Sequence, residues 1–441
     1  MKHAIYLSTL CLLTLVSLGC RQETIPEFEP NRVYSHGLEL EIGYPMQQAL
    51  DETQVALTDM FGTPDQPRVP DFLTEEDSDF AGLLSLEKLQ LAAGPVTDEG
   101  GGLYRAYCMT CHGLVGNGRG TTAALLDPYP RDYRLGKFKF KSTDLNGKPT
   151  REDLAKVIAH GVDGTSMKPY RELADAKEES DAEIEKQVDA LVDYVIYLSW
   201  RGELERYVMM VAGEEVAFED GDTLYNPQAE NFEEQKELIV ELAMEIGDSW
   251  LEAPDRIVEV TDPPEGTPVP ATIEELEQAI AAGNAPELQA SIDRGRELFA
   301  SEKAACAKCH GKLGYGDGQT QDYDDWAKDW TTKLGLDPTD YDSLVPFIAR
   351  GVLPPRKILP RDFRQGLFRG GSAPEDIYRR IAGGIAGTPM PAAAVPEEDI
   401  WDLVNYVRSM RTASDTPDAP TTPAAETPAA ETPAAEPATA E

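Results

Sequence analysis

Cysteine, histidine and basic residues are scarce in this chain. The 441 residues include six cysteines and five histidines. Four cysteines fall in two copies of the pattern Cys-x-x-Cys-His, and the other two, Cys11 and Cys20, fall within the first twenty residues. No cysteine therefore remains for a structural disulfide, and any covalent stapling of the folded domains has to come from another source.

Positive charge is the second shortage. The chain has 40 Lys and Arg against 79 Asp and Glu, for a net charge of −39. That balance argues against nucleic acid as a partner and against direct adhesion to anionic lipid. Residues 202–285 alone hold 22 acidic and 3 basic side chains. This segment could steer a basic partner, and the alternative is a solvated surface that keeps the protein soluble.

The N-terminus has the pattern of an export signal. Lys2 and His3 precede an apolar run over residues 4–18, which is too short to span a bilayer comfortably. The ending Leu18-Gly19-Cys20 resembles a bacterial lipoprotein cleavage box, although Ser17 departs from its usual pattern. We expect a signal peptide over residues 1–19 and a lipid anchor on Cys20 that faces the periplasm. Ordinary signal cleavage is the alternative.

The two Cys-x-x-Cys-His strings carry the chemistry. On one helical turn, residues i, i+3 and i+4 share a face, so two thiols can bond one haem while the histidine ligates its iron. The pattern is typical of c-type haem attachment, and a zinc site or a dithiol redox pair is the alternative. The sequence thus predicts two covalently bound haems c, held by Cys108, Cys111 and His112 and by Cys306, Cys309 and His310.

An internal repeat surrounds these strings. Residues 130–138 resemble 360–368, residues 158–167 resemble 381–390, and residues 191–195 resemble 403–407. Because the landmarks recur in the same order, we infer that a domain was duplicated. Apolar residues in the closing segments fall at helical spacing, which predicts an all-α fold.

The domain boundaries follow from the repeat and from composition. We expect two haem domains over residues 91–205 and 286–411, joined by an acidic, partly helical linker over residues 206–285. An N-terminal extension over residues 20–90, with one helix over residues 46–60, either spaces the domains from the membrane or packs on the first of them. The tail over residues 412–441 repeats Thr-Pro-Ala-Ala-Glu and should be disordered.

Met167 and Met390 are the candidates for the sixth iron ligand. Each follows Gly-Thr-x at matching places in the two copies, and thioether ligation raises the reduction potential of haem iron. His160 is the rival in the first copy. Arg131 and Arg361 also recur, and arginine suits the carboxylates of haem propionates; surface solubility is the alternative.

The two copies differ by one insert. Pro130 follows His112 by 18 positions, whereas Pro360 follows His310 by 50, so the second copy carries about 32 extra residues. Inserts of this kind usually cover a surface, and this one could mask one side of the second haem.

With these motifs the chain resembles the class I cytochrome c superfamily, as a tandem dihaem protein. The resemblance rests on Gly-x-x-Leu-aromatic, Cys-x-x-Cys-His-Gly, Gly-Thr-x-Met and the closing Leu-Val-x-Tyr-Val helix. It implies kinship with lipid-anchored cytochrome c subunits of bacterial respiratory chains, such as those serving alternative complex III or terminal oxidases.

Three functions are compatible with this resemblance. The first is a carrier of single electrons between respiratory partners, which is not itself an enzyme. The second is a dihaem peroxidase or reductase with one displaceable ligand. The third is a haem-based sensor in which a gas displaces methionine.

Overall fold

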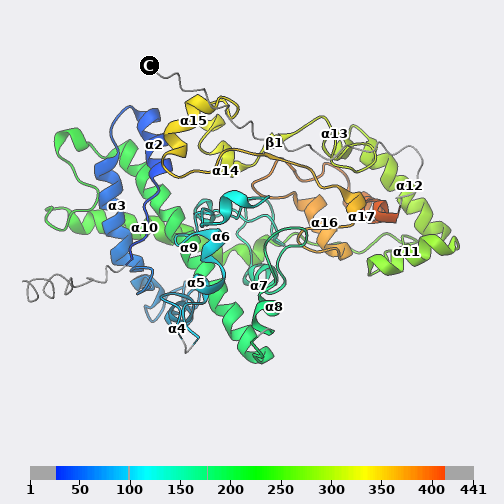
Figure 1. The fold of residues 1–441 in the computed structure, drawn as a ribbon, viewed down its shortest axis with the longest axis horizontal. Coiled ribbons are helices and arrows are strands. Elements are labelled where there is room, and N and C mark those ends of the chain that lie inside the picture. Colours follow the sequence, from blue (N-terminus) through cyan, green and yellow to red (C-terminus); the bar gives the residue numbers. More distant parts are fainter. Residues whose placement is uncertain (1–25, 98–99, 176, 413–441) are drawn as a thin grey trace, which may run out of the picture.

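A computed structural model describes residues 26–97, 100–175 and 177–412 (Figure 1). The all-α fold is confirmed, with one antiparallel pair of two-residue strands in the described part, β1 (Asp322–Tyr323) and β2 (Lys357–Ile358). The expected signal peptide, Cys20 and the tail beyond residue 412 lie outside the described residues. No described helix is long and apolar enough to cross a membrane.

The first domain is built around one very long helix. Helix α9 (Asp181–Glu215) begins at Ser180, whose side chain accepts a hydrogen bond from the amide of Glu183. It is buried on several faces because short elements surround it, and it continues past residue 205. Of the domain's short elements, those that pack on α9 are α5 (Leu103–Tyr107), η3 (Tyr133–Leu135), α7 (Arg151–His160) and α8 (Tyr170–Asp175), and α6 (Met109–His112) and η2 (Ala123–Leu125) complete the domain.

The N-terminal extension packs on this first domain. Helix α3 (Gln47–Phe61) confirms the helix expected over residues 46–60 and ends at Gly62, whose φ of 76° suits glycine. The side chain of Thr53 is fully buried against Met209 of α9. The extension also contains α2 (Arg32–Ile42), η1 (Asp71–Leu73) and α4 (Leu86–Ala92).

The acidic linker is folded rather than free. Its first half, with η4 (Phe218–Asp220), α10 (Phe232–Leu251) and η5 (Ala253–Arg256), belongs to the first domain. There, the indole N–H of Trp200 in α9 donates to the carbonyl of Ala243 in α10 at 2.9 Å. Its second half belongs to the second domain, where the indole N–H of Trp401 donates to the carbonyl of Thr261 at 2.9 Å. Helix α11 (Ile273–Ala282) completes this half.

The second domain has two main helices that cross closely. Helix α12 (Pro286–Ala300) meets α17 (Glu397–Ser409) at Gly295, where an added Cβ would lie 2.0 Å from the carbonyl oxygen of Asp402. Only glycine permits this approach. The remaining elements of the unit are α13 (Cys306–His310), η7 (Phe363–Gln365), α16 (Pro374–Gly383) and η8 (Met410–Thr412).

The insert of the second domain reaches back toward the N-terminal extension (Figure 1). It holds α14 (Asp325–Lys328), η6 (Thr332–Leu334) and α15 (Tyr341–Ile348) between the two strands. Trp330 and Phe347 form a small buried cluster with Val33 of α2. The insert therefore packs against the N-terminal extension.

Candidate haem sites

Each Cys-x-x-Cys-His string forms one helical turn, α6 in the first copy and α13 in the second. Both turns end at a glycine with the same backbone angles, φ 74° and ψ 160°, at Gly113 and Gly311. The four cysteines are half-buried. Burial raises the pKa of the Cys108 thiol to about 12 and that of the Cys306 thiol to about 11.

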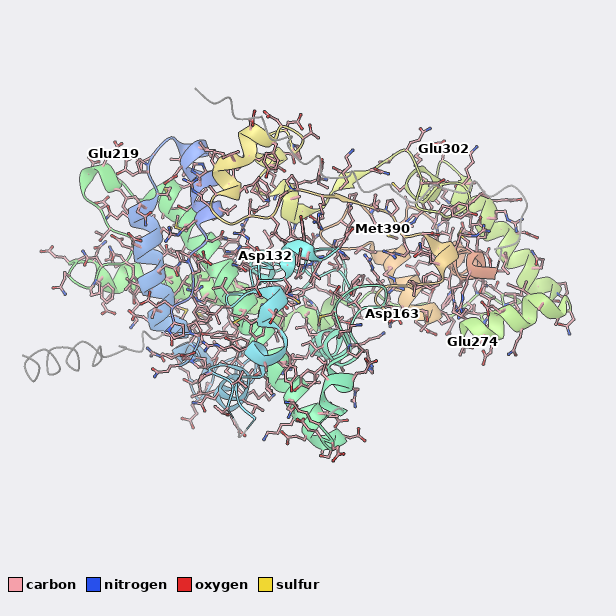
Figure 2. The ribbon with its side chains drawn as sticks, viewed as in Figure 1. Asp132, Asp163, Glu219, Glu274, Glu302 and Met390 are labelled. Carbon is pink, nitrogen blue, oxygen red and sulfur yellow. The ribbon has the colours of Figure 1, made fainter. Side chains whose placement is uncertain are left out.

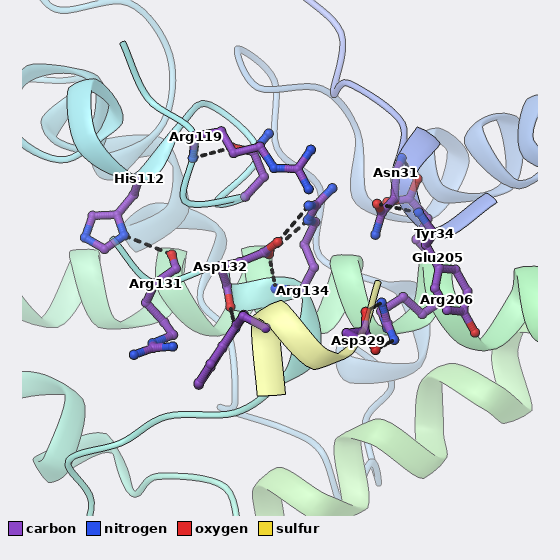
Figure 3. A network of polar contacts seen from close by, with 12 residues as sticks. Asn31, Tyr34, His112, Arg119, Arg131, Asp132, Arg134, Glu205, Arg206 and Asp329 are labelled. Atoms are coloured by element: carbon purple, nitrogen blue, oxygen red, sulfur yellow. Dashed lines mark hydrogen bonds and ion pairs between the residues drawn. The ribbon is translucent and has the colours of Figure 1, made fainter. Parts of the chain in front are cut away.

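The histidine of each string is oriented by a backbone carbonyl. Nδ1 of His112 lies 3.2 Å from the carbonyl oxygen of Arg131, and Nδ1 of His310 lies 3.1 Å from that of Arg361 (Figure 3 shows the first). A carbonyl only accepts, so Nδ1 carries the proton and the lone pair of Nε2 is free for a metal. Burial lowers the pKa of His112 to about 4 and also lowers that of His310, which keeps both rings neutral.

An aromatic ring stacks on each histidine. Tyr133 lies 5.0 Å from His112, centroid to centroid, and Phe363 lies 4.5 Å from His310, with interplanar angles of 18° and 21°. The amides of these two aromatic residues donate to Gly116 and Gly314, both at 2.8 Å. The loop after each string is thus fixed in the same way, and the duplication extends to individual hydrogen bonds.

The two methionine loops are also copies of each other. The amide of Val162 donates to the carbonyl of Met167 at 3.0 Å, and that of Ile385 donates to Met390 at 3.1 Å. In both loops the methionine amide donates to a threonine hydroxyl at 3.1 Å, and these hydroxyls belong to Thr165 and Thr388. Such bonded loops hold each half-buried thioether at a fixed place relative to its backbone.

His160 lies elsewhere. It is the last residue of α7 and is exposed to solvent, whereas Met167 is half-buried seven positions later. This difference favours the thioether of Met167 over the imidazole of His160 as a buried ligand. Both roles stay predictions, as does the role of Met390. Among the described residues, no group of three or more His, Cys, Asp or Glu is arranged to hold a metal ion.

Basic side chains from both copies line one cavity between the domains. Its volume is about 570 Å³, and it includes Arg131 and Arg361, the predicted propionate partners. It also includes Lys139 and Arg369, which occupy matching positions in the repeat. Sequence reasoning missed this second pair, although the repeat extended by one residue beyond Phe138 and Phe368 would have found it.

Two of these cations, Arg131 and Lys139, share one carboxylate, that of Asp324, at 3.9 and 3.4 Å. Burial lowers the pKa of Arg131 and of Arg369 to about 10, and that of Lys139 to about 7. Within the described chain, the buried Nε of Arg369 has no hydrogen-bond partner. A carboxylate-bearing group such as haem fits a cradle of this kind. Haem therefore suits both ends of the site, with thiols and a neutral imidazole on one side and cations on the other.

Two family models match the chain. The model "Cytochrome c" matches residues 292–411, and the model "Cytochrome C oxidase, cbb3-type, subunit III" matches residues 95–195. No curated protein matches significantly. A chain of the Kuenenia stuttgartiensis reducing HAO-like protein complex is 25% identical, covering 72% of this chain and 97% of its own, with a TM-score of 0.40.

The family matches cover both halves of the repeat, and each contains one Cys-x-x-Cys-His string. These matches agree with the helical fold and with the paired histidine and methionine loops. The chain therefore belongs to the cytochrome c superfamily, as a tandem class I cytochrome c that binds haem c covalently and transfers electrons through it.

Proposed function

We propose that this chain is a dihaem electron carrier that passes single electrons between membrane-associated partners of a bacterial respiratory chain. The observation that carries the proposal is that both copies have the same histidine and methionine loops, bond for bond. Two closed ligand sets suit electron transfer, because nothing then needs to bind at the metal. The protein would not be an enzyme itself, although it could be a subunit of one.

Each site has residues for covalent attachment, for iron ligation and for binding carboxylates. Cys108 and Cys111 in the first copy, and Cys306 and Cys309 in the second, hold the group covalently. His112 and His310 would ligate the iron through their Nε2 atoms, and Met167 and Met390 would supply a second, thioether ligand. Arg131 and Arg361, with Lys139 and Arg369, bind its carboxylates. Haem c, when bound, supplies a reversible one-electron iron couple, and thioether ligation raises the potential of that couple.

Partners and location form the second part of the proposal. The match of residues 95–195 to subunit III of cbb3-type oxidases supports a partner in a redox complex, with a terminal oxidase or alternative complex III as candidates. Acylated Cys20 would anchor the exported protein to the membrane on its periplasmic side. The net charge of −39 argues against nucleic acid as a partner.

The haem count and ligation are tested on the exported protein. Haem staining after a denaturing gel and intact mass should show two added macrocycles, and one in a Cys306→Ala/Cys309→Ala variant. The oxidised spectrum should be fully low-spin, with a methionine-to-iron charge-transfer band. Peroxide turnover with a reduced donor would favour the peroxidase or reductase instead, and carbon monoxide binding at neutral pH would favour the sensor.

The anchor and the partner need a separate test. Cys20→Ala should release the protein from the membrane fraction while leaving its haem content unchanged. Co-purification from solubilised membranes, followed by haem staining, should recover an oxidase or another respiratory complex. Recovery of the wild-type protein as a soluble species without partners would contradict this part of the proposal.

A further inference from the structure

The insert of the second domain places a tryptophan on the histidine loop of the first domain. The guanidinium carbon of Arg131 lies 3.3 Å from the ring centroid of Trp326, a close cation–π contact. The indole N–H of Trp326 donates to the carbonyl of Asp132 at 2.8 Å. Arg131 is the residue whose own carbonyl accepts the Nδ1 proton of His112. A residue of the second domain therefore contacts the loop that orients the first histidine.

The same tryptophan touches the methionine loop of its own domain. A Cβ added at Gly387 would lie 2.4 Å from Cζ3 of Trp326, so the ring packs directly on that backbone. Beside it, the amide of Asp325 donates to the carbonyl of Gly387 at 3.0 Å. Gly387 stands three residues before Met390. Trp326 thus lies between the loop that orients His112 and the loop that carries Met390.

Two carboxylates beside the tryptophan match the charge of the loop opposite. Asp324 lies 3.4 Å from Nζ of Lys139 and 3.9 Å from the guanidinium of Arg131, and Asp325 pairs with Lys137. In the repeat, Lys137 and Lys139 correspond to Leu367 and Arg369. These last two pack on the opposite methionine loop, at Gly164. The methionine loop of the first domain is thus contacted by the repeat itself, through Leu367 and Arg369. The methionine loop of the second domain is contacted by the insert instead.

We propose that Asp324, Asp325 and Trp326 form a lock between the two domains, and that Trp326 is a positioning residue for the first haem site. Trp326 holds the side chain of Arg131 and the carbonyl of Asp132, and so fixes the backbone that orients His112. The lock rests on contacts within the protein and does not depend on the identity of any electron partner. It gives the insert a task at the first site as well as a contact with the methionine loop of the second.

The lock is tested by hydrogen exchange on the full-length, haem-loaded protein. Trp326→Leu removes both the cation–π contact and the indole hydrogen bond, so exchange in residues 131–139 and 385–390 should rise about tenfold. Trp326→Phe keeps a ring over Arg131 and should restore much of the protection. Trp330→Leu is the matched control, because Trp330 packs on Phe347 in the core of the insert and should loosen residues 341–352 instead.

A reduction potential separates positioning from simple packing. Trp326→Leu should shift the midpoint potential of the first site, and Trp326→Phe should return it toward the wild-type value. The first site is identified as the one whose potential moves in Tyr133→Leu, since Tyr133 stacks on His112. Unchanged exchange in both loops, or an unmoved first-site potential in Trp326→Leu, would overturn the proposal. Neither hydrogen exchange nor the potential depends on the respiratory partner, so this test remains valid even if the proposed function is wrong.

Discussion

The methionine loops set the properties of the two sites at the scale of single residues. In each loop the backbone amide and carbonyl of the methionine are hydrogen-bonded, and so is the threonine hydroxyl. These bonds hold the loop backbone in one conformation and so limit how far the sulfur can move. We expect Met390→Ala to lower the potential of the second site by on the order of 0.1 V, and to let carbon monoxide bind there. Potentiometry and a carbon monoxide difference spectrum measure both effects.

His160 provides the control for that experiment. Its side chain is exposed, so His160→Ala should leave the low-spin spectrum unchanged, whereas Met167→Ala should alter it. The opposite result would mean that the imidazole is the ligand of the first site. Unchanged potentials in both methionine variants would mean that the methionines only fill space in their loops.

A buried ion pair joins the loop before α7 to α9 in the first domain. Nζ of Lys148 pairs with the carboxylate of Glu203, and both side chains are buried. Lys148→Met would leave a buried charge without its partner, so the first domain should lose about 3–5 kcal/mol of stability. The double variant Lys148→Met/Glu203→Leu removes both charges and should recover most of that loss. Chemical unfolding measures the difference, and equal losses in the two variants would contradict this account.

Single residues also show what sequence could predict. The cysteines and histidines were located by spacing alone, and the methionines and arginines by the repeat, because these signals are local. The carbonyl that Arg131 offers to His112 has no sequence signal, since every residue has a carbonyl. Trp326 has no sequence signal of its own, because its partners in the first domain lie about 190 positions away along the chain and only the fold brings them together.

At the scale of elements, the crossing of α12 and α17 depends on one glycine. At Gly295 the neighbour is the backbone of Asp402, which cannot turn aside as a side chain can. Gly295→Val should therefore push the helices apart and cost the second domain about 1–3 kcal/mol or more. Ala290→Ser, at an exposed position of the same helix, should stay within about 0.5 kcal/mol. Thermal unfolding of both variants provides the comparison, and equal shifts would contradict it.

The matching segment of the first domain shows where the repeat misleads. The pattern Gly-x-x-Leu-aromatic predicts one helix before each haem string, and α12 agrees. In the first copy two shorter helices stand there: α4 ends at Ala92, just before Gly94-Pro95, and α5 begins after Gly102, whose φ is 74°. Sequence similarity at three positions did not reveal this break, since glycine serves a close crossing in one copy and a turn in the other.

At the scale of the whole molecule, the two domains are joined along several lines of contact. In the view of Figure 2, Asp132, Asp163 and Met390 lie in the central part of the molecule, whereas Glu219, Glu274 and Glu302 lie toward its outside. The linker was expected to be an acidic connection, and its charge does lie partly on exposed faces. Its apolar residues were too sparse to predict that each half would join the core of a different domain.

Two ion pairs between the domains allow the strength of this joining to be measured. Arg206 of α9 binds Asp329 of the insert through two hydrogen bonds of 2.9 Å, and each side chain is 16% exposed. Lys156 of α7 binds Asp376 of α16 at 2.7 Å, but its side chain is 52% exposed. Because the half-buried bidentate pair is screened less by water and salt than the exposed one, it should contribute more to holding the domains together.

Arg206→Met should therefore weaken the joining more than Lys156→Met. We expect a loss of about 1.5–3 kcal/mol for the first change and about 0–1 kcal/mol for the second. Limited proteolysis of the insert, at residues 322–359, measures the opening: cleavage should speed up strongly in Arg206→Met and little in Lys156→Met. The two variants should be cleaved at the same rate if Arg206 is merely a surface charge. If the Arg206–Asp329 pair is shielded from solvent, the cleavage rates of the two variants should still differ in 1 M salt. At that salt concentration, exposed charges more than about 3 Å apart are largely screened from each other.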